Sequence, residues 1–251
     1  MCGRYVLTDL EKFLERQAWI KRPKDGALGP GKLSGRYNIA PMQDVAAVLR
    51  DKDEPAAAVV KAFRWGLVPS WAKDESVGNR MINARAESLL EKPAFKRALA
   101  KRRCLIPADA FYEWKKPEGK GRHKQPYAFR LKGDRPFAFA GLWEAWRDPQ
   151  HEDRPPLFTT TIITGQPNAL VAPVHDRMPV ILPEAAYRDW LDVEARDAEA
   201  AAALLVPYPA EDMHAYPVDQ RVGNVGNDDP ALLAPEPPAA DGAAEAQPGL
   251  F

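Results

Sequence analysis

The second residue of the chain is a cysteine, and its type and place together could do chemistry. Removal of Met1 would leave Cys2 with a free α-amine beside its thiol. The pKa of an α-amine is about 7.7–8.0, so roughly a tenth or more is neutral at pH 7, against about a thousandth for a lysine amine. Such an amine attacks an aldehyde, and the thiol can then close a five-membered ring on the imine carbon. An N-terminal Cys2 therefore predicts capture of aldehydes as a thiazolidine, although position alone is also consistent with an incidental cysteine.

Chemistry on an imine also needs an acid or base close to the reacting carbon. Glu113 lies in an aromatic, strand-like stretch, where burial would raise its pKa. His175 lies in a segment bounded by prolines that also contains a carboxylate and a guanidinium. Residues 83–87 supply an amide, a guanidinium and a carboxylate at every second position, so a strand would present all three on one face. The competing interpretation is that Glu113 points into solvent and that His175 serves the fold.

The formal net charge of zero conceals an uneven distribution along the chain. Residues 1–147 contain 30 Lys and Arg against 17 Asp and Glu, whereas residues 148–251 contain 5 against 18. A basic excess of this size attracts polyanions such as nucleic acids, and a solvated charged surface is the alternative. The two cysteines and four histidines favour neither a disulfide framework nor a metal or organic cofactor. No apolar run approaches the roughly 18 residues of a membrane span. Because the chain has only two cysteines and its first residues lack the order of a secretory signal, we expect a cytoplasmic protein.

The elements that must position these residues are mostly short strands. Apolar spacing predicts helices over 7–20, 88–103 and 183–203, with Thr8 or Asp9 capping the first and Pro93 starting or breaking the second. Strand-like runs cover residues 45–50, 56–63, 104–106, 111–114, 127–131, 137–143 and 158–164. The turn at 51–54 predicts a hairpin between the first two. This pattern indicates an α+β single domain, with a mainly antiparallel sheet curled into an open β-barrel with flanking helices.

The end of the chain differs in composition from the rest. Residues 230–251 contain seven Ala, five Pro and two Gly, and no Lys or Arg. Such a segment cannot bury enough apolar surface to offset the entropy of ordering it. We therefore expect one domain over residues 2–229, followed by a disordered or loosely attached tail over 230–251.

Eight short blocks, in the same order, resemble the SRAP family of SOS response-associated peptidases, which includes the abasic-site processing proteins related to 5-hydroxymethylcytosine binders. They are MCGRY at 1–5, RYNIAP at 36–41, WGLVPSW at 65–71, NARAE at 83–87, RCLIP at 103–107, FYEW at 111–114, HDRMP at 175–179 and VGNV at 222–225. The resemblance covers about residues 2–227. It implies a protein of the DNA damage response that senses abasic sites in single-stranded DNA and crosslinks itself covalently to them.

The resemblance also implies roles for individual residues. Cys2 would be the nucleophile, Asn83 would position the site, and proton transfers would fall to Glu113 and His175. We further expect a nucleoid-associated monomer that needs no cofactor and whose protein partners the sequence does not reveal.

The DNA contacts implied by the resemblance fall on arginines and tryptophans. Phosphates would be held by Arg4, Arg85 and Arg177, because guanidinium groups bind phosphate oxygens in pairs. Bases would stack on Trp65 and Trp71, whose rings accept any base.

Three other functions remain open from the sequence. The family label itself indicates a thiol autopeptidase, and lyase-type activity would follow from an imine intermediate. Glutamine amidotransferases also begin with a cysteine followed by glycine, and their cysteine thiol attacks a side-chain amide. The third alternative is a noncovalent reader of modified DNA that uses the same basic surface.

Overall fold

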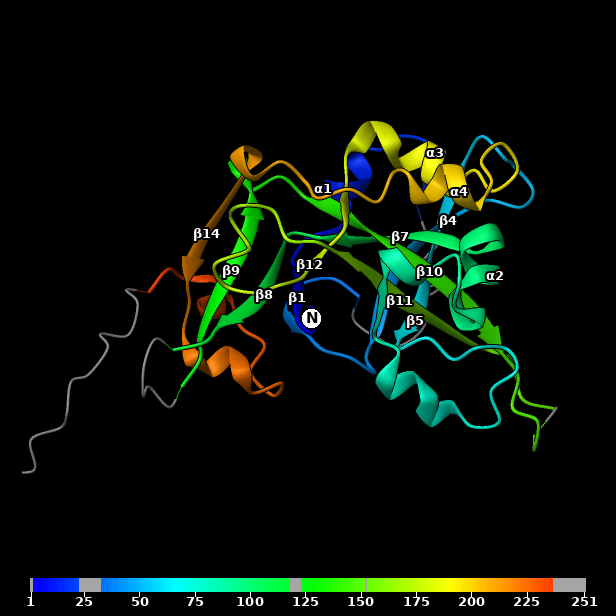
Figure 1. Ribbon diagram of the computed structural model, residues 1–251, viewed down its shortest axis with the longest axis horizontal. Coiled ribbons are helices and arrows are strands. Elements are labelled where there is room, and N and C mark those ends of the chain that lie inside the picture. Colours follow the sequence, from blue (N-terminus) through cyan, green and yellow to red (C-terminus); the bar gives the residue numbers. More distant parts are fainter. Residues whose placement is uncertain (1, 23–32, 118–122, 152, 237–251) are drawn as a thin grey trace, which may run out of the picture.

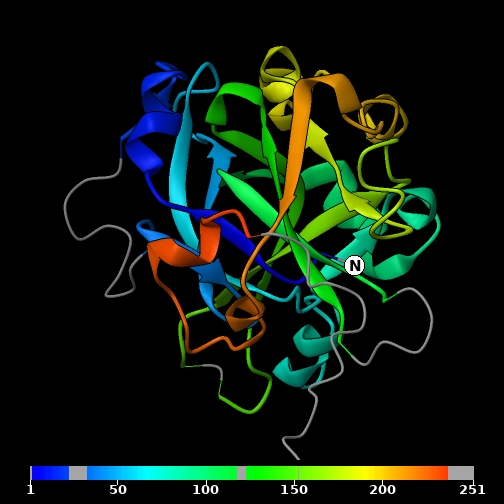
Figure 2. The same ribbon diagram turned by 90° about the vertical axis from the view of Figure 1, so that its left-hand side faces the viewer.

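The computed structural model describes residues 2–22, 33–117, 123–151 and 153–236. Two groups of strands form the centre of the fold, with the helices placed around them (Figures 1 and 2). The expected α+β single domain with a mainly antiparallel sheet is confirmed.

Five strands form a closed barrel, which differs from the open barrel expected from the sequence. Around the ring they are β5 (Ala58–Trp65), β4 (Asp44–Arg50), β7 (Arg103–Ala108), β10 (Phe137–Trp146) and β11 (Leu157–Gly165). Four of the five pairings are antiparallel, and the ring closes through a parallel pairing of β5 with β11. A ring with an odd number of strands cannot alternate direction throughout, so one pairing must be parallel. Closure removes the exposed sheet edge that an open barrel would leave.

Four short strands extend the barrel strands. β2 (Ile20–Lys21) runs parallel to β5, and β6 (Asn83–Arg85) runs parallel to β11. β12 (Met178–Pro179) pairs with the end of β11, and β13 (Ile181–Leu182) pairs with β10. β6 and β12 thus bring two sequence motifs, residues 83–87 and 175–179, to the same strand of the barrel.

A second, antiparallel sheet lies beside the barrel. Its order is β14 (Met213–Pro217), β9 (Gln125–Leu131), β8 (Ala110–Lys115), β1 (Tyr5–Leu7) and β3 (Arg36–Ile39). β7 and β8, expected as successive strands, are separated by Asp109 alone and belong to different sheets. The buried Asp109 carboxylate accepts hydrogen bonds from the backbone N–H and the hydroxyl of Thr8, both at 2.6 Å, which secures this change of sheet.

Aromatic rings join the two sheets in one core. Tyr5 on β1 packs edge-on against Trp65 and Phe139 of the barrel, with ring centroids 5.5 and 5.8 Å apart. Phe111 on β8 stacks on Phe129 of β9 at 5.0 Å and also meets Phe139 edge-on. β1, drawn in blue, lies between β8 and β3 in its own sheet and packs on the barrel through Tyr5 (Figure 1).

The helices are shorter than the sequence predicts. They are α1 (Leu10–Glu15), capped by Asp9, α2 (Pro93–Lys101), which Pro93 begins, α3 (Tyr187–Leu191) and α4 (Ala198–Ala202). Short 3-10 turns cover Glu75–Arg80, Ala86–Ser88, Lys132–Asp134, Glu184–Ala186, Ala210–Asp212, Gln220–Gly223 and Pro230–Leu233. The long helix expected over 183–203 is broken because the buried Arg103 guanidinium takes backbone carbonyls of Trp190, Asp192 and Arg196 as hydrogen-bond acceptors.

The beginning of the expected tail is ordered. Residues Pro230–Leu233 form a 3-10 turn, and Leu232 is fully buried against the face of the second sheet that points away from the barrel. The hydroxyl of Tyr112 lies 3.4 Å from the carbonyl of Leu232, and that of Tyr216 donates to the carbonyl of Leu233 at 3.1 Å. The expectation of a loosely attached segment is thus wrong for residues 230–236, because two leucines in the Ala/Pro-rich stretch find an apolar surface. Residues 237–251 lie outside the described residues.

In the part of the chain that the structure describes, no helix combines the length and the apolar character needed to cross a membrane.

Candidate active site

Strand pairing places the N-terminal segment beside Glu113. Tyr5 pairs with Phe111, and the backbone N–H of Tyr112 donates to the carbonyl of Arg4 at 3.0 Å. Continued by two residues, this register brings the chain before β1 alongside the second half of β8. Cys2 is fully buried there.

Asn83 holds the backbone of Cys2. It is the first residue of β6, where it pairs with Ile162 of β11. Its side-chain Nδ2 donates to the carbonyl of Cys2 at 3.0 Å and to that of Ile82 at 2.8 Å. Its Oδ1 is buried and accepts no hydrogen bond from the described residues. Asn83 thus anchors Cys2 to the barrel, and its own side-chain oxygen Oδ1 lies in the site as a hydrogen-bond acceptor.

The Cys2 thiol lies in an environment that keeps it protonated. Its Sγ is 3.8 Å from the carbonyl oxygen of Arg4, toward which the S–H can point. Burial raises the pKa of the Cys2 thiol, and the nearby negative charge of Glu113 raises it further. At neutral pH the thiol therefore needs a base before it can react as a nucleophile.

Glu113 is the buried acid of the site. Alternation along β8 places it on the same face as Phe111, toward the core, and its exposure is 2%. Burial raises the pKa of Glu113 to about 7. Its burial agrees with the interpretation that the aromatic strand encloses it, not with the one in which it points into solvent. A carboxyl group with such a pKa can both give and take a proton near neutral pH.

His175 faces Glu113 from the loop before β12. Its Nε2 lies 4.0 Å from Oε2 of Glu113. Its Nδ1 lies 3.0 Å from a carboxylate oxygen of Asp176 and accepts a hydrogen bond of 3.0 Å from the backbone N–H of Arg177. Burial lowers the pKa of His175, so the neutral imidazole dominates at pH 7. The contacts of Nδ1 with Asp176 and Arg177 leave Nε2 as the ring nitrogen that faces Glu113.

The arginines assigned to phosphates differ in how free they are. Arg85 is exposed on β6. Arg177 instead forms a two-pronged ion pair with Glu87, at 2.7 and 2.9 Å, and also donates to the carbonyl of Thr164.

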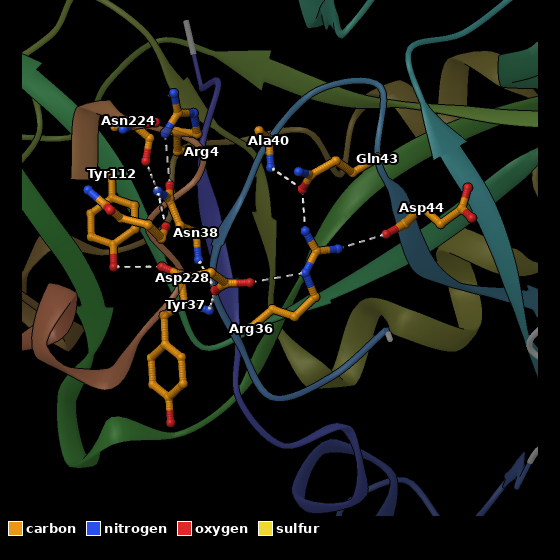
Figure 3. Close-up of polar contacts among 11 residues, drawn as sticks. Arg4, Arg36, Tyr37, Asn38, Ala40, Gln43, Asp44, Tyr112, Asn224 and Asp228 are labelled. Atoms are coloured by element: carbon orange, nitrogen blue, oxygen red, sulfur yellow. Dashed lines mark hydrogen bonds and ion pairs between the residues drawn. The ribbon is translucent and has the colours of Figure 1, made fainter. Parts of the chain in front are cut away.

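Arg4 belongs to a network that binds residues 220–228 to β3 (Figure 3). Its guanidinium donates to Oδ1 of Asn38 at 2.9 Å and to the carbonyls of Val222 and Gly223 at 2.7 and 3.0 Å. It also lies over the ring of Trp114, 6.0 Å from the centroid. Three of its hydrogen bonds therefore go to the protein itself, and a phosphate at Arg4 would have to share them.

The two tryptophans lie in different environments. Trp71 is 66% exposed in the loop after β5, with a face open to solvent. Trp65 is fully buried, packs against Tyr5 and donates from its indole N–H to the carbonyl of Ile82 at 2.8 Å. Trp65 does not fit the stacking role expected of it, because a base cannot reach its ring in this fold.

Two residues with organising roles were missed from the sequence. The sequence predicts Glu87 as a carboxylate on a strand face, but β6 ends at Arg85 and Glu87 lies in the following 3-10 turn, where it pairs with Arg177. The sequence shows Asn38 only within a motif, whereas its buried side-chain Nδ2 donates to the carbonyls of Val222, Asn224 and Asn227. A single asparagine surrounded by apolar and aromatic residues was the only sequence signal, and its partners are some 190 residues away.

The fold and the site together define a class of protein. It is a single-domain α+β protein in which a closed barrel and a second sheet bury Cys2 beside an amide and a carboxyl group of raised pKa, with a histidine facing that carboxyl group. Within the described ranges, no three His, Cys, Asp or Glu side chains gather as a metal site.

Comparison with known proteins gives the family. Residues 1–225 match the family model described as SOS response associated peptidase (SRAP), and the chain belongs to this family. It is 43% identical over 234 residues to the abasic site processing protein YoqW of Bacillus subtilis, covering 93% of this chain and 99% of the relative. It is 31% identical to the abasic site processing protein HMCES of Gallus gallus, covering 94% of this chain and 78% of the relative.

Solved structures show the same fold. A protein from Bacteroides thetaiotaomicron superposes with a TM-score of 0.81 at 24% identity, covering 94% of this chain and all of the other. A protein from Bordetella bronchiseptica superposes with a TM-score of 0.70 at 27% identity, covering 87% of this chain and all of the other.

Proposed function

We propose that this protein captures abasic sites in single-stranded DNA as a covalent thiazolidine crosslink, through Cys2 after removal of Met1. The observation that carries the proposal is the burial of Cys2 beside Glu113, a carboxyl group whose pKa is raised to about 7, with Asn83 holding the Cys2 carbonyl. The names of the relatives support abasic sites as the target.

The chemistry balances with the loss of one water. The ring-opened sugar of an abasic site presents an aldehyde, and the Cys2 amine adds to its carbon to form a carbinolamine. The hydroxyl leaves as water when it receives a proton from an acid, which leaves an iminium ion whose nitrogen keeps one hydrogen. The thiol sulfur then adds to the iminium carbon, and the thiol proton goes to the group that protonated the hydroxyl. The product ring contains the sulfur, the nitrogen, two carbons of Cys2 and the former aldehyde carbon.

Glu113 and His175 suit the proton transfers in these steps. The protonated Glu113 can deliver a proton to the departing hydroxyl, and the resulting carboxylate can then take the proton from the thiol. Its raised pKa serves both directions near pH 7. The neutral His175, with Nε2 4.0 Å from Glu113, can share a proton with the same carboxyl group during ring opening and reversal.

The buried, protonated thiol also bears on the other candidate chemistries. In an amidotransferase or thiol peptidase the thiol attacks first, so burial that raises the pKa of Cys2 works against that step. In thiazolidine formation the amine attacks first, and the thiol reacts only with an imine already held beside it.

The test is the intact mass of the protein before and after incubation with an abasic single-stranded oligonucleotide. We expect loss of Met1 and an adduct equal to protein plus oligonucleotide minus one water. Cys2→Ser keeps the amine and should give only an imine that borohydride traps, while Cys2→Ala keeps DNA binding and also lacks the stable adduct. A stable adduct of unchanged yield in both variants excludes Cys2 as the source of the ring. If the wild type binds abasic DNA without any mass change, the protein is a noncovalent reader, and release of ammonia from glutamine would indicate an amidohydrolase.

A further inference from the structure

The ion pair between Glu87 and Arg177 joins the two motifs that flank the Cys2 site. Glu87 follows β6, the strand that begins with Asn83, and Arg177 precedes β12. The guanidinium gives one Nη to each carboxylate oxygen, at 2.7 and 2.9 Å, and donates as well to the carbonyl of Thr164 on β11 at 2.6 Å. Two parallel bonds of this kind set the orientation of both groups.

Arg177 passes this anchoring on to His175. The backbone N–H of Arg177 donates to Nδ1 of His175, two residues before it, at 3.0 Å. This contact orients the imidazole so that Nε2 is the ring nitrogen facing Glu113, 4.0 Å from its Oε2. The loop that carries His175 is therefore attached through the Arg177 side chain to the barrel and to the end of β6.

We propose that Glu87 is a positioning residue for the capture reaction, which holds Arg177 and thereby keeps the His175 imidazole directed at Glu113. The inference rests on the proposed function for the reaction that it serves. Glu87 is about half exposed, with 48% of its side chain accessible, whereas the Arg177 side chain is 13% accessible. Glu87 itself does not touch Cys2 or Glu113 through any contact between described residues, so its effect reaches the reaction through Arg177 and His175.

This arrangement predicts opposite effects on binding and on the covalent step. Without the Glu87 charge, more N–H donors of the Arg177 guanidinium can bind a DNA phosphate, and no carboxylate repels that phosphate. The noncovalent affinity for DNA should therefore stay the same or rise. Loss of the anchor should slow the covalent step, because a small displacement of a reacting or proton-transferring group is costly.

The experiment compares Glu87→Gln and Glu87→Ala with the wild type. Glutamine keeps one acceptor for Arg177, and alanine keeps none. At saturating abasic DNA we expect the crosslinking rate constant to fall about 3-fold in Glu87→Gln and about 10-fold or more in Glu87→Ala, with Kd unchanged or lower. The pH–rate profile should also shift in both variants. Glu184→Gln is the matched control, because Glu184 forms an exposed ion pair with Arg16 on a different part of the surface.

A second measurement is independent of any reaction. The ring nitrogen resonances of His175, assigned by their loss in His175→Gln, report its tautomer in the DNA-free protein. We expect them to move in Glu87→Ala and not in Glu184→Gln, with both variants folded by thermal melting. Unchanged His175 resonances would overturn the inference whether or not the protein forms a crosslink. A loss confined to Kd would overturn it as well, whereas a wild type without any adduct would refute only the proposed function.

Discussion

At the scale of single residues, the raised pKa of Glu113 suits proton transfer near neutral pH but lowers the stability of the fold there. This pKa of about 7 lies above the 4.5 of an unperturbed glutamate because burial disfavours the carboxylate. The folded protein therefore binds more protons than the unfolded chain between about pH 4.5 and 7. By linkage, the stability contributed by this group is full below pH 4.5 and falls as pH rises through that window.

Replacement of Glu113 by glutamine should make this cost visible. The wild type loses stability from pH 5 to pH 8 because Glu113 ionises, whereas the Glu113→Gln variant has no charge to gain at this position. The unfolding free energy of the variant should therefore rise relative to that of the wild type by on the order of 1–3 kcal/mol between these two pH values. Urea titrations at the two pH values measure this difference. The same variant should form the crosslink about 10²–10⁴-fold more slowly, if Glu113 transfers the proton. Equal pH dependence of stability in both proteins would contradict the buried carboxylate as its source.

Trp65 and Trp71 give a matched pair of substitutions at the same scale. Trp71→Ala removes an exposed ring, so we expect weaker binding of single-stranded DNA by about 1–3 kcal/mol and an unchanged melting temperature. Trp65→Ala empties a core position and should cost about 3–5 kcal/mol of stability. Fluorescence anisotropy and urea melts measure the two effects. Loss of stability without loss of affinity in Trp71→Ala would show that its ring serves the fold.

At the scale of elements, residues 219–233 behave as one attached segment. Asn38 donates to three of its carbonyls, Arg4 donates to two, and Asp228 accepts from the backbone N–H groups of Tyr37 and Asn38 (Figure 3). These contacts replace the hydrogen bonds that an irregular segment cannot make within itself. Because Arg4 is two residues from Cys2, the segment also supports the N-terminal strand.

We expect Asn38→Ala to loosen this segment. The substitution leaves three carbonyls and the Arg4 guanidinium without the amide, so it should cost about 2–3 kcal/mol of stability. Limited proteolysis should cut first between residues 219 and 233, and a urea melt gives the free energy. Gln220→Ala, which loses one exposed hydrogen bond to the carbonyl of Lys124, is the control. If Asn38→Ala is cut within residues 219–233 no faster than the wild type, the role of Asn38 is contradicted.

At the scale of the whole molecule, binding of DNA should depend strongly on salt. The first 147 residues hold the basic excess, and that part of the chain includes the exposed Arg85 and Trp71. On a single strand, each phosphate contact should contribute about −0.7 to the slope of log K against log salt concentration. Titrations at several salt concentrations measure the slope, and Arg85→Gln should reduce it by about one contact. A flat response would contradict phosphate binding.

Much of the architecture could be predicted because local signals decide it. The hairpin of β4 and β5 follows from two apolar runs and an acidic turn, and α2 begins at Pro93 as expected. The long helix over 183–203 was wrong because Arg103, distant in sequence, takes its carbonyls. The ordered start of the tail was missed for the same kind of reason, since Leu232 packs on a surface that no local pattern shows.

The sequence by itself determined the chemical inventory: a cysteine at position 2, a glutamate in an aromatic strand, a histidine between prolines, and the family that these motifs resemble. Only the tertiary structure decided which groups meet and in what state. Burial, which depends on packing from distant strands, raises the pKa of Glu113 and removes Trp65 from the surface. Closure of the barrel through β5 and β11, and the pairing of Glu87 with Arg177 across 90 residues, follow from long-range geometry, which residue types and spacing do not encode locally.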